Sequence, residues 1–447
     1  MNKYLLSISL LVACVAESNA QSGLKPAING AANAIESKVI AWRRDLHEHP
    51  ELGNQEFRTA KIVADHLRKL GYEVQEKVAF TGVVGVLKGG KAGPVVALRA
   101  DMDGLPVTER VDLAFKSQVM TEFNGQKTGI MHACGHDSHV AILMGVAEVL
   151  ASMKNELSGT VKLIFQPAEE GVYDGSTFGA NRMIEEGVLE NPKVDAIFGL
   201  HINSQTEVGK IRYRPGATMA AVDQLAIKIK GKQTHGANPW SGIDPIVTAS
   251  QVVMGLQTII SRNVNITENP AIVTVGAIHG GIRQNIIPES VEMIGTIRTF
   301  GDAQQALVHR RINEVATNIA ESAGAKAEVT IGIGYPVTFN DEALTDKMIP
   351  TLEALAGKDN VIISPVATGA EDFSYFQKKI PGFFFFLGGM PKGKSPYESA
   401  PHHTPDFYID ESGFGLGVKS LSHLVVDYLE MNAKTAAVPT KSKKAGK

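Results

Sequence analysis

The residues with the clearest chemical potential lie in one short segment, residues 132–139, whose sequence is HACGHDSH. It carries three imidazoles, a thiol and a carboxylate, which are the side chains that bind borderline transition metals. Cys134 and His136 are two positions apart, so both would lie on one side of an extended segment but not of a helix. Residues 140–150 are almost all apolar and predict a buried helix. We therefore expect a metal-binding loop that opens into a helix.

Further candidate ligands follow apolar stretches that predict buried strands. Residues 95–98, 161–165 and 196–200 are each such a stretch, and each is followed by acidic or imidazole side chains. Because sites in α/β sheets form beyond the carboxyl ends of the strands, we expect these side chains to meet. With a histidine pair near the C-terminus, the candidate metal ligands are Cys134, His136, one of the pair Glu169 and Glu170, His201, and one of the pair His402 and His403.

The two neighbouring carboxylates suggest a division of roles between Glu169 and Glu170. Two like charges in a low-dielectric site repel each other, and a dication removes that problem for one of them. One carboxylate would then be a ligand, and the other a general base toward a water whose pKa the metal lowers to about 7. Asp103 is a candidate to orient a ligand imidazole; the alternative is an ordinary carboxylate in the turn before Gly104.

The elements that must position these loops alternate along the chain. Residues 34–70 have helical periodicity, interrupted at residues 47–51 (HEHPE). Pro50 breaks the helix and the spacing is not that of a metal motif, so we favour a structural role for this segment. The alternation of helices with buried strands predicts an α/β fold, with a central, mostly parallel sheet flanked by helices in a catalytic domain.

The pattern changes after His201. Residues 223–230 alternate apolar and polar side chains, which predicts a strand with one solvated face. Two helices and three strands are predicted to follow, at residues 245–260, 303–323, 271–278, 290–298 and 327–333. We therefore expect a smaller α+β domain with an antiparallel sheet at residues 217–334, which interrupts a catalytic domain made of residues 33–216 and 335–432.

Composition and the two ends of the chain indicate its binding partners and its localisation. A net charge of −3 over 447 residues gives no reason to expect binding to nucleic acid. Residues 1–20 have the charged start, apolar core and small final residue of a signal peptide, which predicts a periplasmic or secreted protein. Residues 11–14 (LVAC) also resemble a lipobox, which would instead anchor the chain to a membrane through a lipid on Cys14. The basic tail, residues 433–447, is predicted to be disordered.

Cysteine usage supports a metal site. Of the two cysteines, Cys14 lies in the predicted signal peptide, so Cys134 has no partner for an internal disulfide. A lone thiol is a liability in an oxidising compartment. Metal ligation would protect it and keep it a thiolate.

Four motifs together resemble the M20 metallopeptidase family, and within it the branch of hippurate hydrolases and auxin-conjugate (IAA-amino acid) hydrolases. They are residues 99–103 (RADMD), 132–137 (HACGHD), 166–171 (QPAEEG) and 369–373 (GAEDF). The resemblance implies a catalytic domain with an inserted lid or dimerisation domain, and a centre of two divalent ions (zinc, manganese, cobalt or nickel). The ligands that it implies are Cys134, His136, Glu170, His201 and His403, with Glu169 as general base and Asp103 beside them.

The resemblance also assigns residues outside the metal cluster. His235, in residues 231–239 (GKQTHGANP), matches the lid histidine that is expected to steady the oxyanion. Asn285 and Arg298 match residues that hold a substrate carboxylate, for which arginine offers two parallel hydrogen bonds. Gly369 is expected to line the substrate site. The inserted domain further implies a homodimer formed through the lid.

These observations predict a metal-dependent amidohydrolase that cleaves an N-acyl amino acid into a carboxylate and a free amino acid. One alternative is a dipeptidase or carboxypeptidase of the same family, acting on short peptides. An alternative of a different class is a periplasmic metal- or peptide-binding protein without catalysis. Glu169 argues against that class, because binding needs ligands but no base. The identity of the acyl group does not follow from the motifs.

Overall fold

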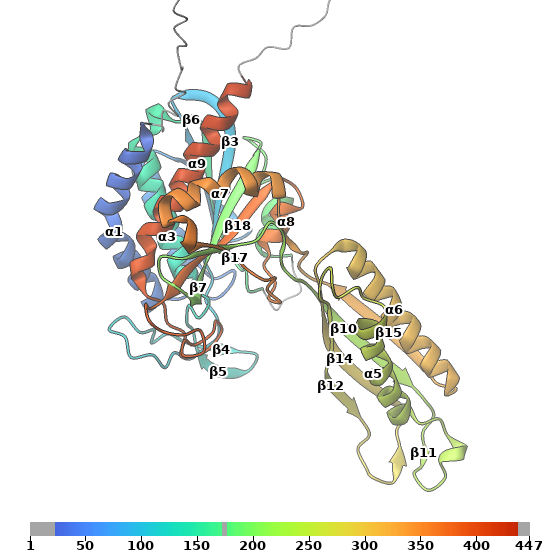
Figure 1. Ribbon diagram of the computed structural model, residues 1–447. Helices are drawn as coiled ribbons and strands as arrows, with labels where there is room; N and C mark the ends of the chain where they lie inside the picture. The colour runs from blue at the N-terminus through green and yellow to red at the C-terminus, as the bar shows by residue number, and fades with distance from the viewer. Residues whose placement is uncertain (1–22, 172–176, 437–447) are drawn as a thin grey trace, which may run out of the picture.

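The computed structural model describes residues 23–171 and 177–436, which form two bodies, each with its own sheet (Figure 1). The predicted signal peptide, Cys14 included, lies outside the described residues, as do residues 437–447 of the predicted tail. The last helix, α9 (Phe414–Ala436), continues into the segment where the tail was expected to begin.

Within the described residues, the larger body contains a sheet of eight strands in the order β1-β2-β6-β3-β7-β18-β8-β17. The strands β6, β3, β7 and β18 run parallel, while β1 and β2 pair antiparallel with their neighbours. At the other edge, β8 is antiparallel to β18 and parallel to β17. The predicted parallel sheet is thus confirmed at its centre, and the whole sheet is mixed. Its strands are β1 (Glu73–Val78), β2 (Gly82–Lys88), β3 (Lys91–Asp101), β6 (Ser158–Gln166), β7 (Ala196–Glu207), β8 (Ile211–Tyr213), β17 (Val361–Ile363) and β18 (Gly382–Met390).

Helices cover both faces of this sheet, which explains the uninterrupted apolar runs. Because side chains alternate along a strand, Phe383 and Phe385 of β18 enter one core while Phe384 enters the other. The first core is closed by α1 (Leu24–Glu48), α2 (Phe57–Lys69), α3 (His136–Ser152), α7 (Glu342–Ala356) and α9, and the second by α4 (Gly179–Glu185) and α8 (Phe373–Gln377). Among the described residues, no helix is long and apolar enough to cross a membrane.

The smaller body is built differently, from an antiparallel sheet with one covered face. The strand order is β12-β14-β10-β15, and α5 (Pro245–Arg262) and α6 (Asp302–Ser322) pack on one face (Figure 1). Burial in β10 alternates residue by residue, as the sequence pattern predicted. The strands are β10 (Ala221–Lys230), β12 (Ile272–Gly280), β14 (Ser290–Thr299) and β15 (Lys326–Ile333), with a separate pair, β11 (Thr234–His235) and β13 (Ile286–Ile287).

Short elements complete the fold. The pair β9 (Gly216–Met219) and β16 (Thr338–Asn340) joins the two chain segments that connect the bodies. The hairpin β4 (Met120–Phe123) and β5 (Gln126–Gly129) projects from the larger body (Figure 1). Sequence analysis did not predict this hairpin, although Asn124-Gly125, both with positive φ, is a strong hairpin-turn signal. The 3-10 helices are η1 (Lys154–Glu156), η2 (Pro239–Ser241), η3 (Lys358–Asn360) and η4 (Glu411–Gly413).

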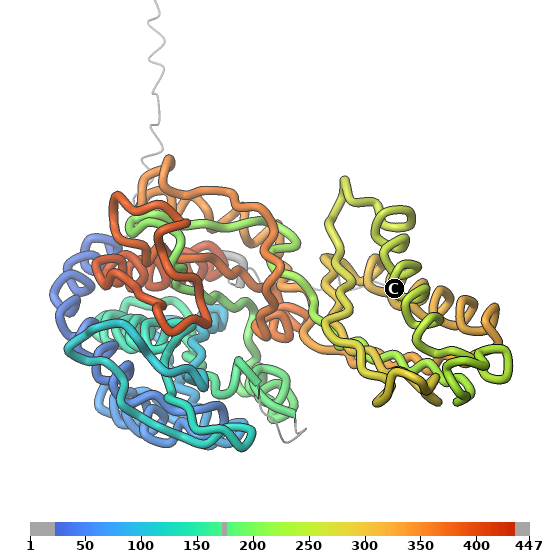
Figure 2. Tube along the Cα trace, turned by 90° about the horizontal axis from the view of Figure 1, so that it is seen from below, coloured from blue at the N-terminus to red at the C-terminus, as the bar shows by residue number. Residues whose placement is uncertain are grey.

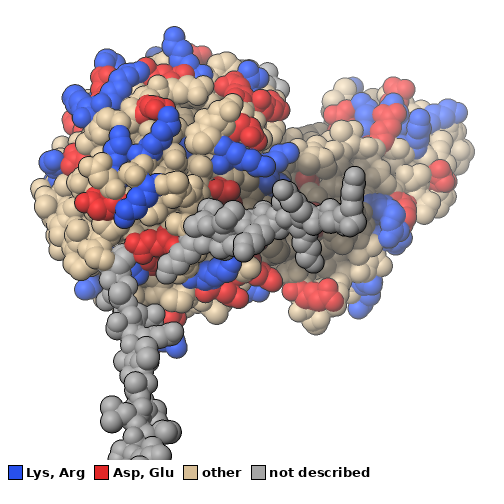
Figure 3. All heavy atoms as spheres, turned by 90° about the horizontal axis from the view of Figure 1, so that it is seen from above, with Lys and Arg blue, Asp and Glu red and all other residues tan. Residues whose placement is uncertain are grey.

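The two bodies lie side by side and are joined by a narrow connection when seen from below (Figure 2). On the face seen from above, acidic and basic side chains are interspersed over the larger body (Figure 3).

Candidate active site

The predicted ligands converge at one edge of the large sheet. Asp101 ends β3, Glu169 and Glu170 follow the end of β6, and His201 lies within β7. Since β3, β6 and β7 are parallel, their carboxyl ends share an edge, and the loop before α3 adds Cys134 there.

The five predicted ligands lie within bonding range of a common pair of positions. Cys134 Sγ is 3.4 Å from His201 Nε2 and 3.3 Å from His403 Nε2. Glu170 Oε1 is 3.1 Å from His403 Nε2 and 4.0 Å from His136 Nε2. The donor atoms of Cys134, His136 and His201 form one group within 4.8 Å, and those of Cys134, Glu170 and His403 form a second. Cys134 therefore belongs to both groups.

The path of the chain between two of these ligands differs from the expectation. Cys134 and His136 were expected in one extended segment, but His136 is the first residue of α3 and Gly135 caps the helix with φ 93°. That left-handed conformation suits glycine, and a Cβ atom here would lie 2.4 Å from Ile202 Cγ2. The turn at Gly135, rather than strand alternation, brings the thiol and the imidazole together.

The donor set fits divalent metal ions. His136 Nε2 and Glu170 Oε1 are buried and make no hydrogen bond within the described structure. His201 Nδ1 donates to its neighbour's carbonyl, Ile202 O, at 2.6 Å, which leaves the Nε2 lone pair directed to the cluster. Unpartnered buried donor atoms of sulfur, nitrogen and oxygen are what a zinc-, cobalt- or nickel-type ion requires.

The thiol also needs a cation. Burial, followed by the charges of Glu170 and Glu169, raises the pKa of the Cys134 thiol well above its ordinary value. A thiolate forms in such surroundings when a bound cation offsets the carboxylates.

Neighbouring histidines are already occupied by hydrogen bonds. His402 Nδ1 donates to Cys134 O at 3.2 Å, and His402 Nε2 accepts from Ser204 N at 3.2 Å. His139 Nδ1 donates to Asp101, while its Nε2 accepts from Ile202 N at 2.8 Å. Both rings lack a free lone pair, so His403 rather than His402 points its donor atom at the cluster.

Asp103 fastens several parts of the site. Its Oδ1 accepts from His136 Nδ1 at 3.2 Å and from Glu169 N at 3.1 Å, and its Oδ2 accepts from Glu170 N at 3.0 Å. The first bond fixes the tautomer of His136, with Nε2 unprotonated. The other two hold the backbone of the adjacent glutamates.

A second carboxylate, which sequence analysis missed, binds the same turn of the backbone. Glu56 is buried and its Oε1 accepts from Ala168 N at 2.8 Å. Ala168 has φ 51°, an uncommon conformation for a residue with a Cβ atom. Glu56 and Asp103 together therefore bind three successive N–H groups and fix the turn that presents Glu169. No local motif announces Glu56, because it lies more than a hundred positions before its partner.

Glu169 lies in a buried, acidic environment. Burial raises its pKa well above the ordinary value, and the charges of Glu371, Glu170 and Asp372 raise it further. Its Oε1 accepts a long hydrogen bond, 3.4 Å, from Asp372 N, and Tyr335 Oη donates to its backbone carbonyl at 2.6 Å. It is thus a carboxylate prepared to take up a proton.

A buried guanidinium lies beneath this carboxylate cluster. Arg99 pairs with Asp101 at 2.6 Å, Asp372 at 2.8 Å and Glu371 at 2.9 Å, and all four side chains are almost fully buried. Gln166 donates to both oxygens of Asp372. Sequence analysis quoted the motifs that contain these residues but gave the residues no role.

The predicted substrate residues divide into two pairs. Arg298 and Gly369 line a cavity of about 430 Å³ together with Glu169, Cys134 and other residues of the cluster. His235 and Asn285 do not line it. They lie in and beside the β11–β13 pair, at the end of the smaller body farthest from the large sheet (Figure 1).

The segment at residues 47–51 has the structural role that we favoured. His47 is buried, with Nδ1 2.7 Å from Asp137 Oδ2 and Nε2 3.2 Å from Glu109 Oε1. Arg43 Nε lies 2.9 Å from the same Asp137 oxygen. This network ties α1 to the first turn of α3, next to His136.

A cluster of thiol, imidazole and carboxylate donors beside a buried free carboxylate defines a metal-dependent hydrolase. The model of the peptidase family M20/M25/M40 matches residues 97–427 of this chain. The chain belongs to that family and is one of its metallo-hydrolases.

Individual relatives agree with this assignment. The chain is 41% identical over 396 residues to thermostable carboxypeptidase 1 of Saccharolobus solfataricus, covering 88% of this chain and 96% of the relative. It is 38% identical over 430 residues to the IAA-amino acid hydrolase ILR1-like 4 of Arabidopsis thaliana, covering 95% and 93%. Among solved structures, the YXEP protein of Bacillus subtilis, described as a dinuclear metal binding peptidase from the M20 family, has a TM-score of 0.75 at 36% identity, covering 89% and 99%.

Proposed function

We propose that this protein is an amidohydrolase that cleaves N-acyl amino acids into a carboxylate and a free amino acid. The observation that carries the proposal is the placement of Glu169. Its carboxylate lies beside the cluster but outside the two groups that share Cys134, in one cavity with Arg298. A protein that only stored a metal or a peptide would not need a buried base at this point.

The proposed ligands are Cys134, His136 and His201 for one divalent ion and Cys134, Glu170 and His403 for the other. When bound, such ions would lower the pKa of a water molecule and polarise the scissile carbonyl. The donor set suits zinc, cobalt or nickel better than manganese, magnesium or calcium, because it includes a thiolate and three imidazoles.

The chain's own residues would then divide the work. Glu169 takes the proton of the attacking water and returns it to the leaving amine. Asp103 keeps His136 in its tautomer, and Arg298 binds the α-carboxylate of the amino acid while Gly369 lines the same cavity. Tyr335 holds the backbone of Glu169 in position.

We further propose that residues 217–334 serve as a lid and dimerisation domain. His235 and Asn285 are remote from the cluster in the described structure, so they reach a substrate either when their own lid closes or when the lid of a second copy covers the site. Exposed apolar side chains on the smaller body, such as Trp240 and Met254, support an interface between copies. Mixing the inactive variants H235Q and E169Q would restore partial activity only if His235 acts on the partner's site.

Export is a separate proposal that rests on residues 1–20. A soluble periplasmic or secreted protein and a lipoprotein anchored at Cys14 are distinguished by cell fractionation of the wild type and C14S. Retention of the wild type in membranes, with release of C14S, would establish the anchor.

The substitution E169Q tests the mechanism. We expect turnover to fall by about 10²–10⁴-fold, because the amide cannot accept the water's proton, while metal content stays unchanged. E170Q is the matched control, since it should lose metal as well as activity. Full activity of E169Q would overturn the role of Glu169.

A panel of substrates tests the specificity. N-acyl amino acids and dipeptides with the same C-terminal amino acid would be compared with added zinc, manganese, cobalt or nickel. Higher kcat/KM on the N-acyl amino acids is expected, and preference for the dipeptides would support the peptidase alternative, for which the relation to a carboxypeptidase provides the argument.

A further inference from the structure

A second cavity adjoins the metal cluster, and Arg298 does not line it. It has a volume of about 410 Å³ and lies between the loop at residues 52–55, residues 103–106 after β3, residues 121–124 of the hairpin, and residues 170–171. Glu170 lines both this hairpin cavity and the cavity that contains Arg298. The two cavities are therefore neighbours, with a proposed metal ligand as their common wall.

The geometry points to the hairpin cavity as the subsite for the acyl group of the substrate, and to neutral, largely apolar acyl groups as its ligands. This inference rests on the proposed function. The scissile carbonyl must lie at the ligand cluster, and the amino acid extends toward Arg298. The acyl group leaves the carbonyl carbon in the opposite direction, past Glu170, and the hairpin cavity opens there.

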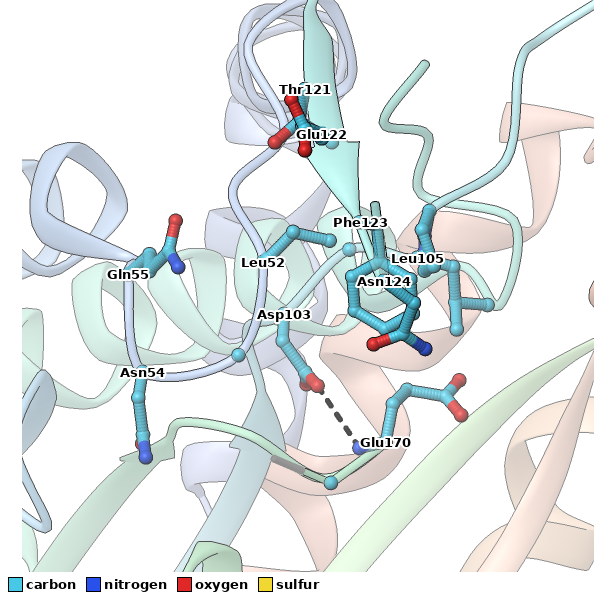
Figure 4. A pocket seen from close by; sticks show the side chains of 14 residues that line it. Leu52, Asn54, Gln55, Asp103, Leu105, Thr121, Glu122, Phe123, Asn124 and Glu170 are labelled. Carbon is cyan, nitrogen blue, oxygen red and sulfur yellow. Dashed lines mark hydrogen bonds between the residues drawn. The ribbon is translucent and has the colours of Figure 1, made fainter. Parts of the chain in front are cut away.

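The hairpin cavity has an apolar part. Leu52, Leu105 and Phe123 lie around the centre of Figure 4, with the Asp103 carboxylate below Leu52 and Glu170 farther below. The neutral polar side chains of Asn54, Gln55, Thr121 and Asn124 complete the lining, so the cavity can receive an apolar group at one part and hydrogen-bonding groups at another. The carboxylate of Asp103 is occupied by His136 and by two backbone N–H groups, so it is not free to select a charged substrate.

The charges of the lining define the class of acyl group more closely. Among the described residues that line the hairpin cavity there is no lysine, arginine or histidine, whereas Glu122 is exposed on the hairpin. A succinyl or glutaryl group would bring a second carboxylate here without a cation to receive it, which is costly away from water. Acyl groups without charge meet no such cost.

The walls are rigid enough to select by size. Leu52 bridges to Gly104 and Leu105 bridges to Met131 through the backbone. The hairpin is tied to the same wall, since Gly129 N donates to Thr108 Oγ1 at 2.8 Å and Thr128 Oγ1 donates to Pro106 O at 3.2 Å. Held in this way, the cavity should keep its volume without substrate, as preorganised sites do.

The substitution T121W tests the inference by filling the cavity. Thr121 lies on the hairpin at i−2 from Phe123, hence on the same face of β4, and a tryptophan suits a strand position. M120W is the matched control, because Met120 is the adjacent residue, is exposed and does not line the cavity. F123A provides the opposite change, an enlarged cavity.

The measurement is kcat/KM on acetyl, hexanoyl, benzoyl and succinyl derivatives of one amino acid. We expect T121W to lower the hexanoyl-to-acetyl ratio at least about tenfold, the scale at which a pocket discriminates by a few methylenes. F123A should raise the same ratio, M120W should leave it unchanged, and the succinyl derivative should be the poorest substrate of the wild type.

The outcomes separate this inference from the proposed function. If the wild type hydrolyses none of the derivatives, the proposed function fails, and this inference with it. If the wild type hydrolyses them but the ratio is the same in T121W and F123A, or if T121W lowers all substrates equally, the proposed function stands and the acyl subsite lies elsewhere. If T121W does not fold, F123A decides alone.

Discussion

The two bodies of this protein differ in how many charged groups they bury: the larger body buries several networks, and the smaller body buries Asp223, which lies 2.7 Å from His309. The larger body buries charged groups in pairs and networks, such as Arg99 with Asp101 and Arg43 with Asp137. In the smaller body, ion pairs such as Lys228–Glu292 lie on the surface. Buried charges are costly unless they are paired, and they are rigid once paired. Rigid placement serves the ligand cluster, whereas under the proposed lid role the smaller body would only have to present side chains to a substrate.

The environments of His136, a proposed ligand, and His235, the proposed oxyanion donor, show the same contrast. His136 is fully buried and held by Asp103, while His235 is exposed on β11, with its Nδ1 accepting from Ala237 N. Apart from the proposed base Glu169, substitutions of buried charged residues in the larger body should therefore affect metal binding or stability, whereas substitution of His235 in the smaller body should affect turnover alone.

Among the variants that compare the two bodies, the largest effect on turnover should come from H235Q. We expect kcat to fall by about 10²–10³-fold, as for the loss of one oxyanion donor, while metal content and the free energy of unfolding remain unchanged. Steady-state kinetics and metal analysis provide the measurement. H279Q, at another exposed histidine of the smaller body, should behave as wild type. A loss of metal in H235Q would contradict the expectation that metal binding depends on the larger body alone.

D137N should affect stability most strongly. The amide removes the buried charge that Arg43 and His47 share and leaves them only Glu411 and Glu109, which we expect to lower the free energy of unfolding by about 3–5 kcal/mol. Denaturant titration of the metal-free protein measures this difference. A stability equal to wild type would show that the network is dispensable.

The stability difference between wild type and D137N should decrease at both low and high pH. Burial raises the pKa of Asp137, but the Arg43 charge and His47 outweigh it, so this stabilisation is present above about pH 4 and is lost as pH falls through the lowered pKa. Burial and Arg43 lower the pKa of His47, but its bonds to Asp137 and Glu109 outweigh them. Because the pKa of His47 is raised on folding, the stabilisation by its protonated ring is complete below about pH 6.5. It is lost as the pH rises through the raised pKa. The difference should therefore be largest between these two values.

D103N should have an intermediate effect. The amide can reverse the hydrogen-bond direction toward His136, which favours the wrong tautomer, and it accepts fewer backbone bonds. We expect a loss of about 10–100-fold in metal affinity, measured by competition with a chelator. D112N, at an exposed aspartate, is the control. If D103N binds metal as tightly as wild type, Asp103 is an ordinary carboxylate in the turn before Gly104 and does not orient His136.

The smallest effect should come from K228Q in the smaller body. The Lys228–Glu292 pair is exposed on both sides, and such pairs are screened by solvent. We expect an unchanged midpoint of thermal unfolding and unchanged activity. A clear destabilisation would show that the smaller body also relies on specific charge pairs.

Much of the fold and the site followed from short patterns. The motifs around Cys134 and Glu169 indicated the candidate metal-ligating atoms, because only a few types of side chain bind metal ions. Periodicity predicted the long helices and the central strands, since their burial repeats within a few residues. The hairpin β4–β5 was missed even though its Asn124-Gly125 turn was a local signal, because its strands are short and mostly polar.

Other features could not follow from local patterns. Glu56 meets Ala168, and Arg99 meets Asp372, across separations that no periodicity encodes. The turn at Gly135 replaced the expected extended segment because packing against Ile202 leaves no room for a Cβ atom.

By itself, the sequence determined which atoms are available for metal and proton chemistry, since those depend on side-chain type and on neighbours in the chain. The tertiary structure alone decided which donors are free. It closed the lone pairs of His402 and His139 with hydrogen bonds, left His136 Nε2 and Glu170 Oε1 unpartnered, and placed His235 far from them. The physical reason is that a free lone pair or a burial cost depends on every group nearby in space, and most of those groups are distant in the chain.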